Sequence, residues 1–409
     1  MEPNALTAAL AELRRQGGPC LDLTVSNPTR CGFPYPEAAI RAALAGAEVL
    51  AYQPDPRGGG TARAAIAAYL GHGLEADELM LTASTSEAYA WLFKLLCDPG
   101  DQVLVPSPSY PLFHWLAALE GVLALPVPAL RHERWNLDLQ GLEAACGPRT
   151  RAVVVVNPNN PTGHFLTRGE WAGLLDLCAR RDLALLVDEV FADYPLEPGP
   201  DRLPTALETP DPPCPLFVLS GLSKIAALPQ VKLGWIAARG ARARALLEPL
   251  AFIADQYLSV SASAQAATPA LLGLAPAIQA GILARLRANL AALDRALAPH
   301  PHLERLRVEG GWAALLRRPA VDSAEDCALR LLRQEGVLVH PGHFFDLPGE
   351  GYLVLSLLPP EEPFRQGVER IAAALGVGAR QHVLARHIQS GSIHQSPGGS
   401  APRPPGFFA

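Results

Sequence analysis

Short runs of β-branched and other apolar residues alternate with longer Ala- and Leu-rich segments between about residues 60 and 290. The short runs predict strands, and the longer segments have helical spacing. The run Val153–Val156 shows no polar alternation, which is typical of a strand buried on both faces of a parallel sheet. The pattern predicts an α/β fold with helices on both faces of the sheet. The predicted strands are Glu78–Thr82, Gln102–Val105, Ala152–Val156, Ala184–Val187, Leu216–Leu219 and Leu233–Ala237, and the clearest helices are Glu87–Leu96, Pro111–Glu120 and Arg168–Arg181.

The pattern changes after a long helical stretch at about 262–298. The remaining pattern indicates a smaller α+β domain. It predicts a helix near Ser323–Glu335 and strands at Leu303–Glu309, Trp312–Leu316, Val337–Val339 and Leu353–Leu357. We therefore expect a small domain made of residues 1–47 and 295–377 and a large domain at 48–294. Residues 378–409 are rich in Gly, Ser, Pro and His, so we expect a disordered tail there.

Charge and cysteine content exclude several classes of protein. The net charge of -6 gives no basic surface for nucleic acid, and no apolar stretch approaches the ~20 residues of a membrane helix. The N-terminus lacks a signal-peptide pattern, so we expect a cytoplasmic protein. The seven cysteines contain no Cys-x-x-Cys pair, which argues against a metal site or a disulfide framework.

Lysine usage points to candidate chemistry. Of 34 basic residues only three are lysines: Lys94, Lys224 and Lys232. An arginine stays protonated and cannot form an imine, whereas a desolvated lysine can attack a carbonyl. Lys94 lies in a helical pattern, where a surface role is the simpler interpretation. Lys224 and Lys232 lie eight residues apart around a predicted strand end.

Polar residues follow five predicted strands, and the carboxyl ends of parallel strands meet at one edge of a sheet. Ser84 and Glu87 have capping-box spacing at a helix start, and Ser84, Thr85 and Ser86 there suit a phosphate, although an ordinary cap has the same pattern. Tyr110 in a Pro-rich loop is either a rim aromatic or a residue that stacks on a planar ring.

The other three strands end in amide, carboxylate and amine groups. Asn157-Pro-Asn-Asn160-Pro-Thr-Gly163 forces a non-helical turn and directs side-chain amides at the strand end. Asp188 ends an apolar strand, where a carboxylate needs a partner unless it only caps a helix. Ser220-Gly-Leu-Ser-Lys224 ends the fifth strand.

Together these motifs resemble the class I/II aminotransferases of the aspartate aminotransferase family. The resemblance covers about residues 20–375, because NPNNPTG, the Asp-Glu strand and the Ser-Lys segment occur in family order and spacing. It implies fold type I, with a mostly parallel seven-stranded sheet and a smaller α+β domain. It also implies pyridoxal 5′-phosphate as the cofactor.

The resemblance assigns roles residue by residue. Lys224 would be the Schiff-base lysine and proton shuttle, and Asp188 would pair with the pyridine nitrogen. Asn160 would hydrogen-bond the phenolic oxygen, and Tyr110 would stack on the ring. The phosphate would be bound by Ser84, Thr85, Ser86, Lys232 and, from the neighbouring subunit of a homodimer, Tyr52. The segment from Ser26 to Phe33 resembles that of bacterial alanine aminotransferases, which makes Asn27 and Arg30 substrate-binding candidates.

Two positions depart from the family pattern. Phe191 stands where the family usually has a Tyr that donates to the phenolic oxygen. Val354 stands where most members have the Arg that binds the substrate carboxylate in two hydrogen bonds. Arg30 and His343 are the candidate replacements for that Arg.

We therefore predict a transaminase of amino acid metabolism that acts on a small or neutral L-amino acid and a 2-oxo acid, in a biosynthetic process. A lyase, decarboxylase or synthase on the same scaffold needs the same Lys, Asp and Asn and is the alternative. A cofactor-sensing regulator would carry an N-terminal DNA-binding domain, for which this chain has no room. A non-catalytic partner protein would not need Lys224 and Asp188.

Overall fold

The structure, a computed structural model, describes residues 4–46, 50, 52–131 and 133–386. Its contacts divide the chain into two units. The larger unit consists of Asn27–Ala284 and Arg307–Trp312. The smaller unit contains the described residues up to Ser26, Arg285–Leu306 and those from Ala313 onward.

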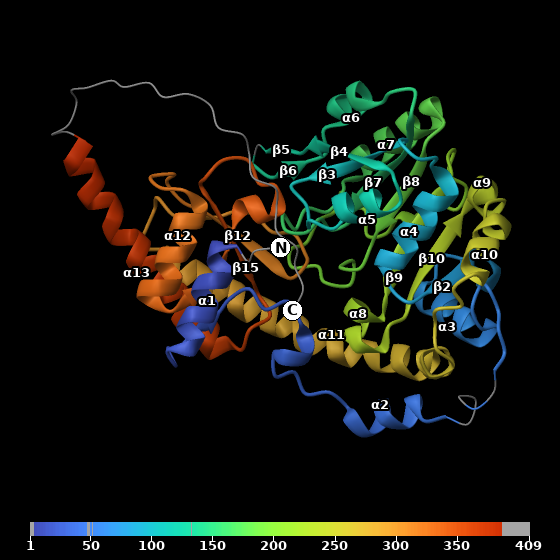
Figure 1. The fold of residues 1–409 in the computed structure, drawn as a ribbon, viewed down its shortest axis with the longest axis horizontal. Coiled ribbons are helices and arrows are strands. Elements are labelled where there is room, and N and C mark those ends of the chain that lie inside the picture. Colours follow the sequence, from blue (N-terminus) through green and yellow to red (C-terminus); the bar gives the residue numbers. More distant parts are fainter. Residues whose placement is uncertain (1–3, 47–49, 51, 132, 387–409) are drawn as a thin grey trace. The chain divides into compact units, whose positions relative to one another are not determined.

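The main sheet of the larger unit has seven strands in its described part, in the order β2-β10-β9-β8-β7-β3-β4 (Figure 1). Strand β10 is antiparallel to β2 and β9, and the other neighbours are parallel. This confirms the predicted mostly parallel α/β sheet. The strands are β2 (Leu79–Thr82), β3 (Gln102–Ser107), β4 (Leu123–Pro128), β7 (Thr150–Val156), β8 (Ala184–Asp188), β9 (Leu216–Gly221) and β10 (Gly234–Arg239).

Helices cover both faces of this sheet, and each face has its own hydrophobic cluster. Val153 and Val155 lie in one cluster and Val154 in the other, which explains why the run of valines shows no alternation. Helices α3, α7 and α11 contribute to the first cluster, and α4, α5 and α10 to the second. The helices of this unit are α2 (Glu37–Leu44), α3 (Gly60–Leu70), α4 (Thr85–Leu96), α5 (Phe113–Leu119), α6 (Leu139–Ala145), α7 (Arg168–Arg181), α8 (Leu222–Ile225), α9 (Gly240–Arg244), α10 (Leu247–Asp255) and the first part of α11 (Ala262–Leu297); β5 (Leu130–Arg131) and β6 (Trp135–Asn136) form a separate ribbon.

The smaller unit is α+β, as predicted. A four-stranded sheet has the order β11-β12-β15-β14, and β1 pairs in parallel with β13. Its elements are α1 (Ala5–Arg15), β1 (Leu21–Asp22), β11 (Glu304–Arg305), β12 (Ala313–Arg317), α12 (Ala324–Arg330), β13 (Val337–Leu338), β14 (His340–Pro341), β15 (Tyr352–Ser356) and α13 (Glu361–Arg386).

The division of the chain differs from the predicted boundaries of 47/48 and 294/295. Residues from Asn27 onward belong to the larger unit, because the Tyr35 hydroxyl donates to the Ala227 carbonyl at 2.7 Å and Ile40 packs against the core of that unit. The second boundary falls inside α11, at Ala284. Helix α13 runs to Arg386, so residues 378–386 are helical and not a disordered tail; 387–409 lie outside the described residues.

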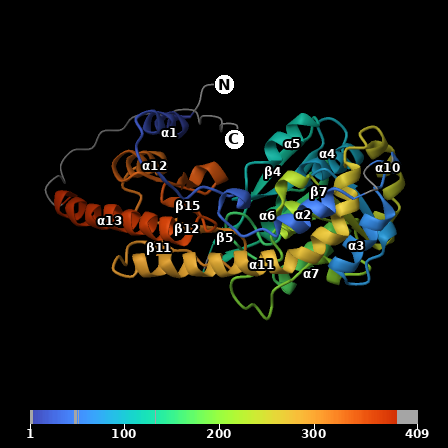
Figure 2. The same ribbon diagram turned by 90° about the horizontal axis from the view of Figure 1, so that it is seen from below.

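Helix α11 differs from the expectation that no apolar stretch approaches the length of a membrane helix. By length and hydropathy alone it is apolar enough to cross a membrane, and it is the single such helix in the described ranges. It is the long gold helix in Figure 2. Ala264, Ala267 and Leu271 are buried in the first hydrophobic cluster, so part of its apolar composition belongs to the core.

Candidate active site

Five strand ends meet at one edge of the main sheet, as the sequence predicts. The register pairs Asp188 of β8 with Val156 and Leu219, and Gly234 of β10 with both Thr82 and Gly221. The segments that follow β2, β9, β8, β7 and β3 therefore start from neighbouring positions. They carry Ser84–Ser86, Lys224, Asp188, Asn160 and Tyr110.

The first segment is the start of helix α4. The Ser84 hydroxyl accepts a hydrogen bond from the Glu87 amide at 3.2 Å, which confirms the predicted cap. The Glu87 carboxylate reaches the Ala83 amide at 2.6 Å, one residue earlier than a capping box requires. Within the described chain the hydroxyls of Thr85 and Ser86 make no hydrogen bond, and the first amides of a helix have no intrahelical acceptor. This helix start can bind an anion.

Asp188 is a buried carboxylate that is 7% exposed. It accepts hydrogen bonds from the Tyr89 hydroxyl at 3.1 Å and from the Val190 amide at 3.0 Å. Burial raises its pKa to about 6, although these two hydrogen bonds and the charge of Lys224 oppose the increase. A cationic partner would stabilise the carboxylate further.

Lys224 lies in the first turn of α8, directly after β9. Its carbonyl accepts a hydrogen bond from the Tyr194 hydroxyl at 2.6 Å. Burial lowers the pKa of its amine to about 8, and the charge of Asp188 opposes this decrease. The amine lies 5.0 Å from the centre of the Trp312 ring and 5.7 Å from that of Phe191. A substantial fraction of the amine is therefore neutral near pH 8 and can act as a nucleophile.

The backbone holds the end of β9 close to β10. A Cβ at Gly221 would lie 2.9 Å from the Gly234 Cα and the Leu233 carbonyl oxygen. A Cβ at Gly234 would lie 3.1 Å from the carbonyl carbon of Ser84. A side chain at Gly221 would therefore displace main chain, and one at Gly234 would require its neighbours to shift by a few tenths of an ångström.

The three asparagines of the Asn-Pro turn have different environments. Asn157 is buried, donates to the Leu203 carbonyl at 3.1 Å and accepts from the Leu166 amide at 3.0 Å. Asn159 accepts from the Thr162 hydroxyl at 2.8 Å. The Asn160 side chain makes no hydrogen bond to any described residue, so both its carbonyl oxygen and its NH₂ group are available for a ligand, whereas the oxygen of Asn159 is already bonded.

This difference yields a paired prediction. Asn160→Ala should weaken cofactor binding about tenfold, the effect of one lost hydrogen bond, with little change in the melting temperature of the cofactor-free protein. Asn157→Ala should instead destabilise that protein by about 2–4 kcal/mol, because it leaves a buried carbonyl and a buried amide without partners. Cofactor titration and thermal unfolding distinguish the two variants. Equal loss of stability in both would contradict the assignment.

Tyr110, Lys232 and Tyr52 are the other predicted cofactor residues. Tyr110 follows β3 and is 43% exposed. Lys232 is exposed and has a left-handed backbone, with φ at 60°. Tyr52 is 83% exposed. Their roles stay predictions.

The predicted substrate residues are spread over both units. Asn27 caps the short helix Pro28–Arg30 by accepting from the Thr29 amide at 3.1 Å. Arg30 is exposed and makes no ion pair with any residue whose position is given. His343 and the buried Val354 belong to the smaller unit, where Val354 pairs with Leu315 and His340 in the sheet.

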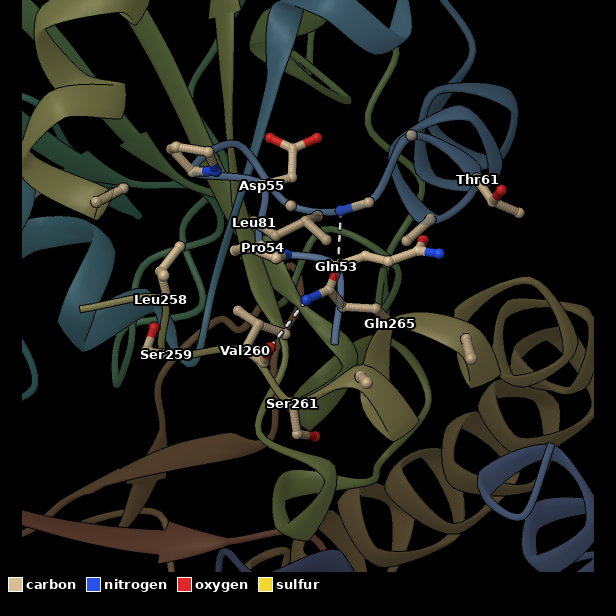
Figure 3. Close-up of a pocket in the computed structure, with 18 of the residues that line it drawn as sticks. Gln53, Pro54, Asp55, Thr61, Leu81, Leu258, Ser259, Val260, Ser261 and Gln265 are labelled. Atoms are coloured by element: carbon tan, nitrogen blue, oxygen red, sulfur yellow. Dashed lines mark hydrogen bonds between the residues drawn. The ribbon is translucent and has the colours of Figure 1, made fainter. Parts of the chain in front are cut away.

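Tyr52 lines a cavity of about 540 Å³ in the larger unit. Figure 3 shows Gln265 at its centre, where its carbonyl accepts from the Gly59 amide at 2.6 Å and its amide donates to the Val260 carbonyl at 2.8 Å. The segment from Leu258 to Ser261 and the start of α3 form the walls. Its lining includes Leu81 of β2 but not Ser84–Ser86, Asp188 or Lys224.

Sequence reasoning missed three aromatic residues of the site. Tyr89 binds Asp188, Tyr194 binds the Lys224 carbonyl, and Trp312 packs edge-on against Phe191 with ring centres 5.3 Å apart. Trp312 follows Gly310 and Gly311, and the sequence pattern predicts it as the first residue of a strand. Among the described residues, no cluster of His, Cys, Asp or Glu could hold a metal ion.

Comparison with known proteins supports the same chemistry. The family described as aminotransferase class I and II matches residues 19–371. An alanine aminotransferase of Mycobacterium bovis is 30% identical over 376 residues, which cover 88% of this chain and 86% of that protein. The arginine–pyruvate transaminase AruH of Pseudomonas aeruginosa is 32% identical over 370 residues, covering 89% and 92%.

Solved structures agree in fold over nearly the whole chain. The alanine aminotransferase from Pyrococcus furiosus superposes with a TM-score of 0.81 at 25% identity, covering 90% of this chain and 95% of that one. A double mutant of the Thermus thermophilus aspartate aminotransferase gives 0.80 at 28% identity, covering 92% and 97%. The chain therefore belongs to the class I and II aminotransferases, which are fold type I enzymes that depend on pyridoxal phosphate.

Proposed function

We propose that this aminotransferase moves the amino group of a small or neutral L-amino acid to a 2-oxo acid of the pyruvate type. The name of one relative, an alanine aminotransferase, supports the amino donor, and that of another, an arginine–pyruvate transaminase, supports an oxo acid of the pyruvate type. The observation that carries the proposal is the depressed pKa of the Lys224 amine, about 8, beside the buried carboxylate of Asp188.

The side chains at the strand edge fit pyridoxal phosphate. The free hydroxyls of Thr85 and Ser86 at a helix start suit its phosphate, with Ser84, Lys232 and a partner subunit's tyrosine at position 52 as further ligands. The buried Asp188 suits a protonated ring nitrogen, and the available amide of Asn160 suits the ring oxygen. Tyr110 would lie against the ring face.

Bound pyridoxal phosphate supplies an aldehyde carbon and an electron-withdrawing ring. Asp188 would hold a proton on the ring nitrogen and so keep the ring electron-withdrawing. The neutral Nζ of Lys224 would accept the proton from the substrate α-carbon. It would deliver this proton to the aldehyde carbon of the cofactor, the atom that takes the substrate's nitrogen. Trp312 and Phe191, both less than 10% exposed, would exclude water from the amine.

The pKa of Lys224 gives a testable pH dependence. In the cofactor-free protein, the rate at which trinitrobenzenesulfonate modifies Lys224 should rise with pH to a midpoint near 8, because only the neutral amine reacts. Asp188→Asn should move this midpoint lower still, since the Asp188 charge favours the protonated amine. Peptide mapping by mass spectrometry follows the rate. A midpoint near the ordinary value of 10.5 would contradict the assignment.

The direct test of the proposed function is a titration of the purified holoenzyme with each amino acid in turn. Substrates should change the absorbance of the bound cofactor, and product analysis should find one oxo acid formed for each acceptor aminated. Release of ammonia or carbon dioxide without acceptor amination would indicate the lyase, decarboxylase or synthase alternative. Small neutral amino acids are expected to give the strongest response.

We also propose that the enzyme is a cytoplasmic homodimer and that it acts in a biosynthetic branch of amino acid metabolism. The exposed Tyr52 beside the 540 Å³ cavity supports the dimer, as do the exposed aromatic residues Phe252 and Tyr257 of the neighbouring α10 segment, which are 73% and 52% exposed. Sedimentation should give twice the mass of the chain. A fully active monomer would exclude the dimer.

A further inference from the structure

Trp312, whose ring lies over the Lys224 amine, carries a buried hydrogen-bond donor without an acceptor among the described residues. Trp312 is 4% exposed, and its indole N–H has no hydrogen-bond partner among the described residues. Burying an indole N–H without an acceptor is costly, so such groups normally find one. Trp135 and Trp312 both depart from this rule, and the ring centre of Trp312 lies 5.0 Å from the Lys224 amine.

The two aromatic residues known to pack on Trp312 make no hydrogen bond to its indole N–H. Phe191 packs on the indole with ring centres 5.3 Å apart and has no polar atom in its side chain. The Tyr194 ring lies 5.1 Å away, and its hydroxyl donates to the Lys224 carbonyl. No hydrogen bond joins the Lys224 amine to the indole N–H, and a protonated amine cannot accept one. A ligand that reaches Lys224 would supply an acceptor near the indole.

The backbone holds Trp312 in this place. The Gly310 amide donates to the Gly163 carbonyl at 3.0 Å, and the Gly311 amide donates to the Tyr194 carbonyl at 3.0 Å. A Cβ at Gly310 would lie 2.5 Å from the Phe165 ring and 2.9 Å from the Tyr194 oxygen, so the segment fits closely against the Asn-Pro turn. A donor fixed in this way needs no reorganisation when the ligand arrives.

We propose that the Trp312 indole N–H donates a hydrogen bond to an anionic oxygen of the ligand bound at Lys224. Two oxygens have this chemistry: the ring oxygen of the cofactor and the carboxylate of the amino acid. Phe191, whose ring centre lies 5.7 Å from the Lys224 amine, carries no hydroxyl for the first. The inference rests on the proposed function only in taking Lys224 as the amine that reacts.

The test compares the holoenzyme of Trp312→Phe with wild type. If the acceptor is the ring oxygen, the variant should raise the midpoint of the pH-dependent cofactor absorbance by about half a unit to one unit, since the lost N–H stabilised the anionic form. If the acceptor is the carboxylate, the variant should bind 2-methylalanine about tenfold more weakly and isopropylamine, which lacks the carboxylate, unchanged.

Trp135→Phe is the matched control. Trp135 is 3% exposed and also has an indole N–H without a partner in the part of the chain described, but it lies in the β5–β6 ribbon. Its substitution should change neither measurement. No change in Trp312→Phe, or the same change in both variants, would overturn the proposal. A wild-type protein without cofactor absorbance would instead refute the proposed function.

Discussion

Replacing Lys224 by alanine should reduce transamination by more than about 10⁴-fold, because the variant loses both the amine that attaches the cofactor and the base that moves the proton. Borohydride reduction of the wild-type holoenzyme should fix the cofactor on Lys224, and the variant should retain none after denaturation. Turnover assays and mapping of the reduced peptide measure these two effects. Among the described lysines, Lys224 is the one whose amine lies over the rings of Phe191 and Trp312.

Lys94→Ala is the matched control for this prediction. Lys94 is exposed on α4 and pairs with Glu120, so its loss removes a surface ion pair of small energetic value. Activity and cofactor content should stay at the wild-type level. A reduced adduct on Lys94 or Lys232 would contradict the assignment of Lys224.

Asp188→Asn should reduce the turnover number about 10²–10³-fold, because a neutral amide does not stabilise a positive charge on the ring nitrogen. The substitution keeps the size of the side chain and an oxygen that can accept from the Val190 amide. Cofactor should therefore still bind. Steady-state kinetics with a saturating amino acid measures the loss, and a variant with wild-type turnover would remove Asp188 from the mechanism.

The same variant has a predicted effect on stability. The pKa of Asp188 is raised from 3.8 to about 6 in the folded protein, so the wild type loses stability as the pH rises from about 4 to about 6. Above pH 6 the full penalty of burying the charge applies. Cofactor-free Asp188→Asn should be more stable than wild type by about 1–3 kcal/mol at pH 7, with no gain below pH 4. Urea unfolding at both pH values tests the sign.

The strands of the main sheet could be predicted because each is a short apolar run, but β4 could not. Its sequence, Leu123-Ala-Leu-Pro-Val-Pro, contains two prolines, which normally argue against a strand. β4 lies at the end of the strand order, where one side of the strand has no neighbour in the sheet. Proline is tolerated there because no ladder hydrogen bond is lost on the open side.

The strand-end residues could be predicted because parallel topology brings consecutive carboxyl ends to one edge. Trp312 could not, since it lies 88 residues after Lys224 and reaches the amine through contacts of Gly310 and Gly311 with distant segments. The sequence likewise contains three asparagines in one turn and does not indicate which is free. Only the hydrogen bonds of Asn157 and Asn159 separate them from Asn160.

The contact between Gly221 and Gly234 has a consequence for how this enzyme can change. The reacting amine is located by two residues that have no side chain, so its placement does not depend on which apolar residues fill the surrounding core. Substrate preference can therefore be altered at neighbouring side chains while the Lys224 amine keeps its position. A methyl group at Gly221, by contrast, would meet main-chain atoms at 2.9 Å, and a change of a nearby side chain would not relieve that contact.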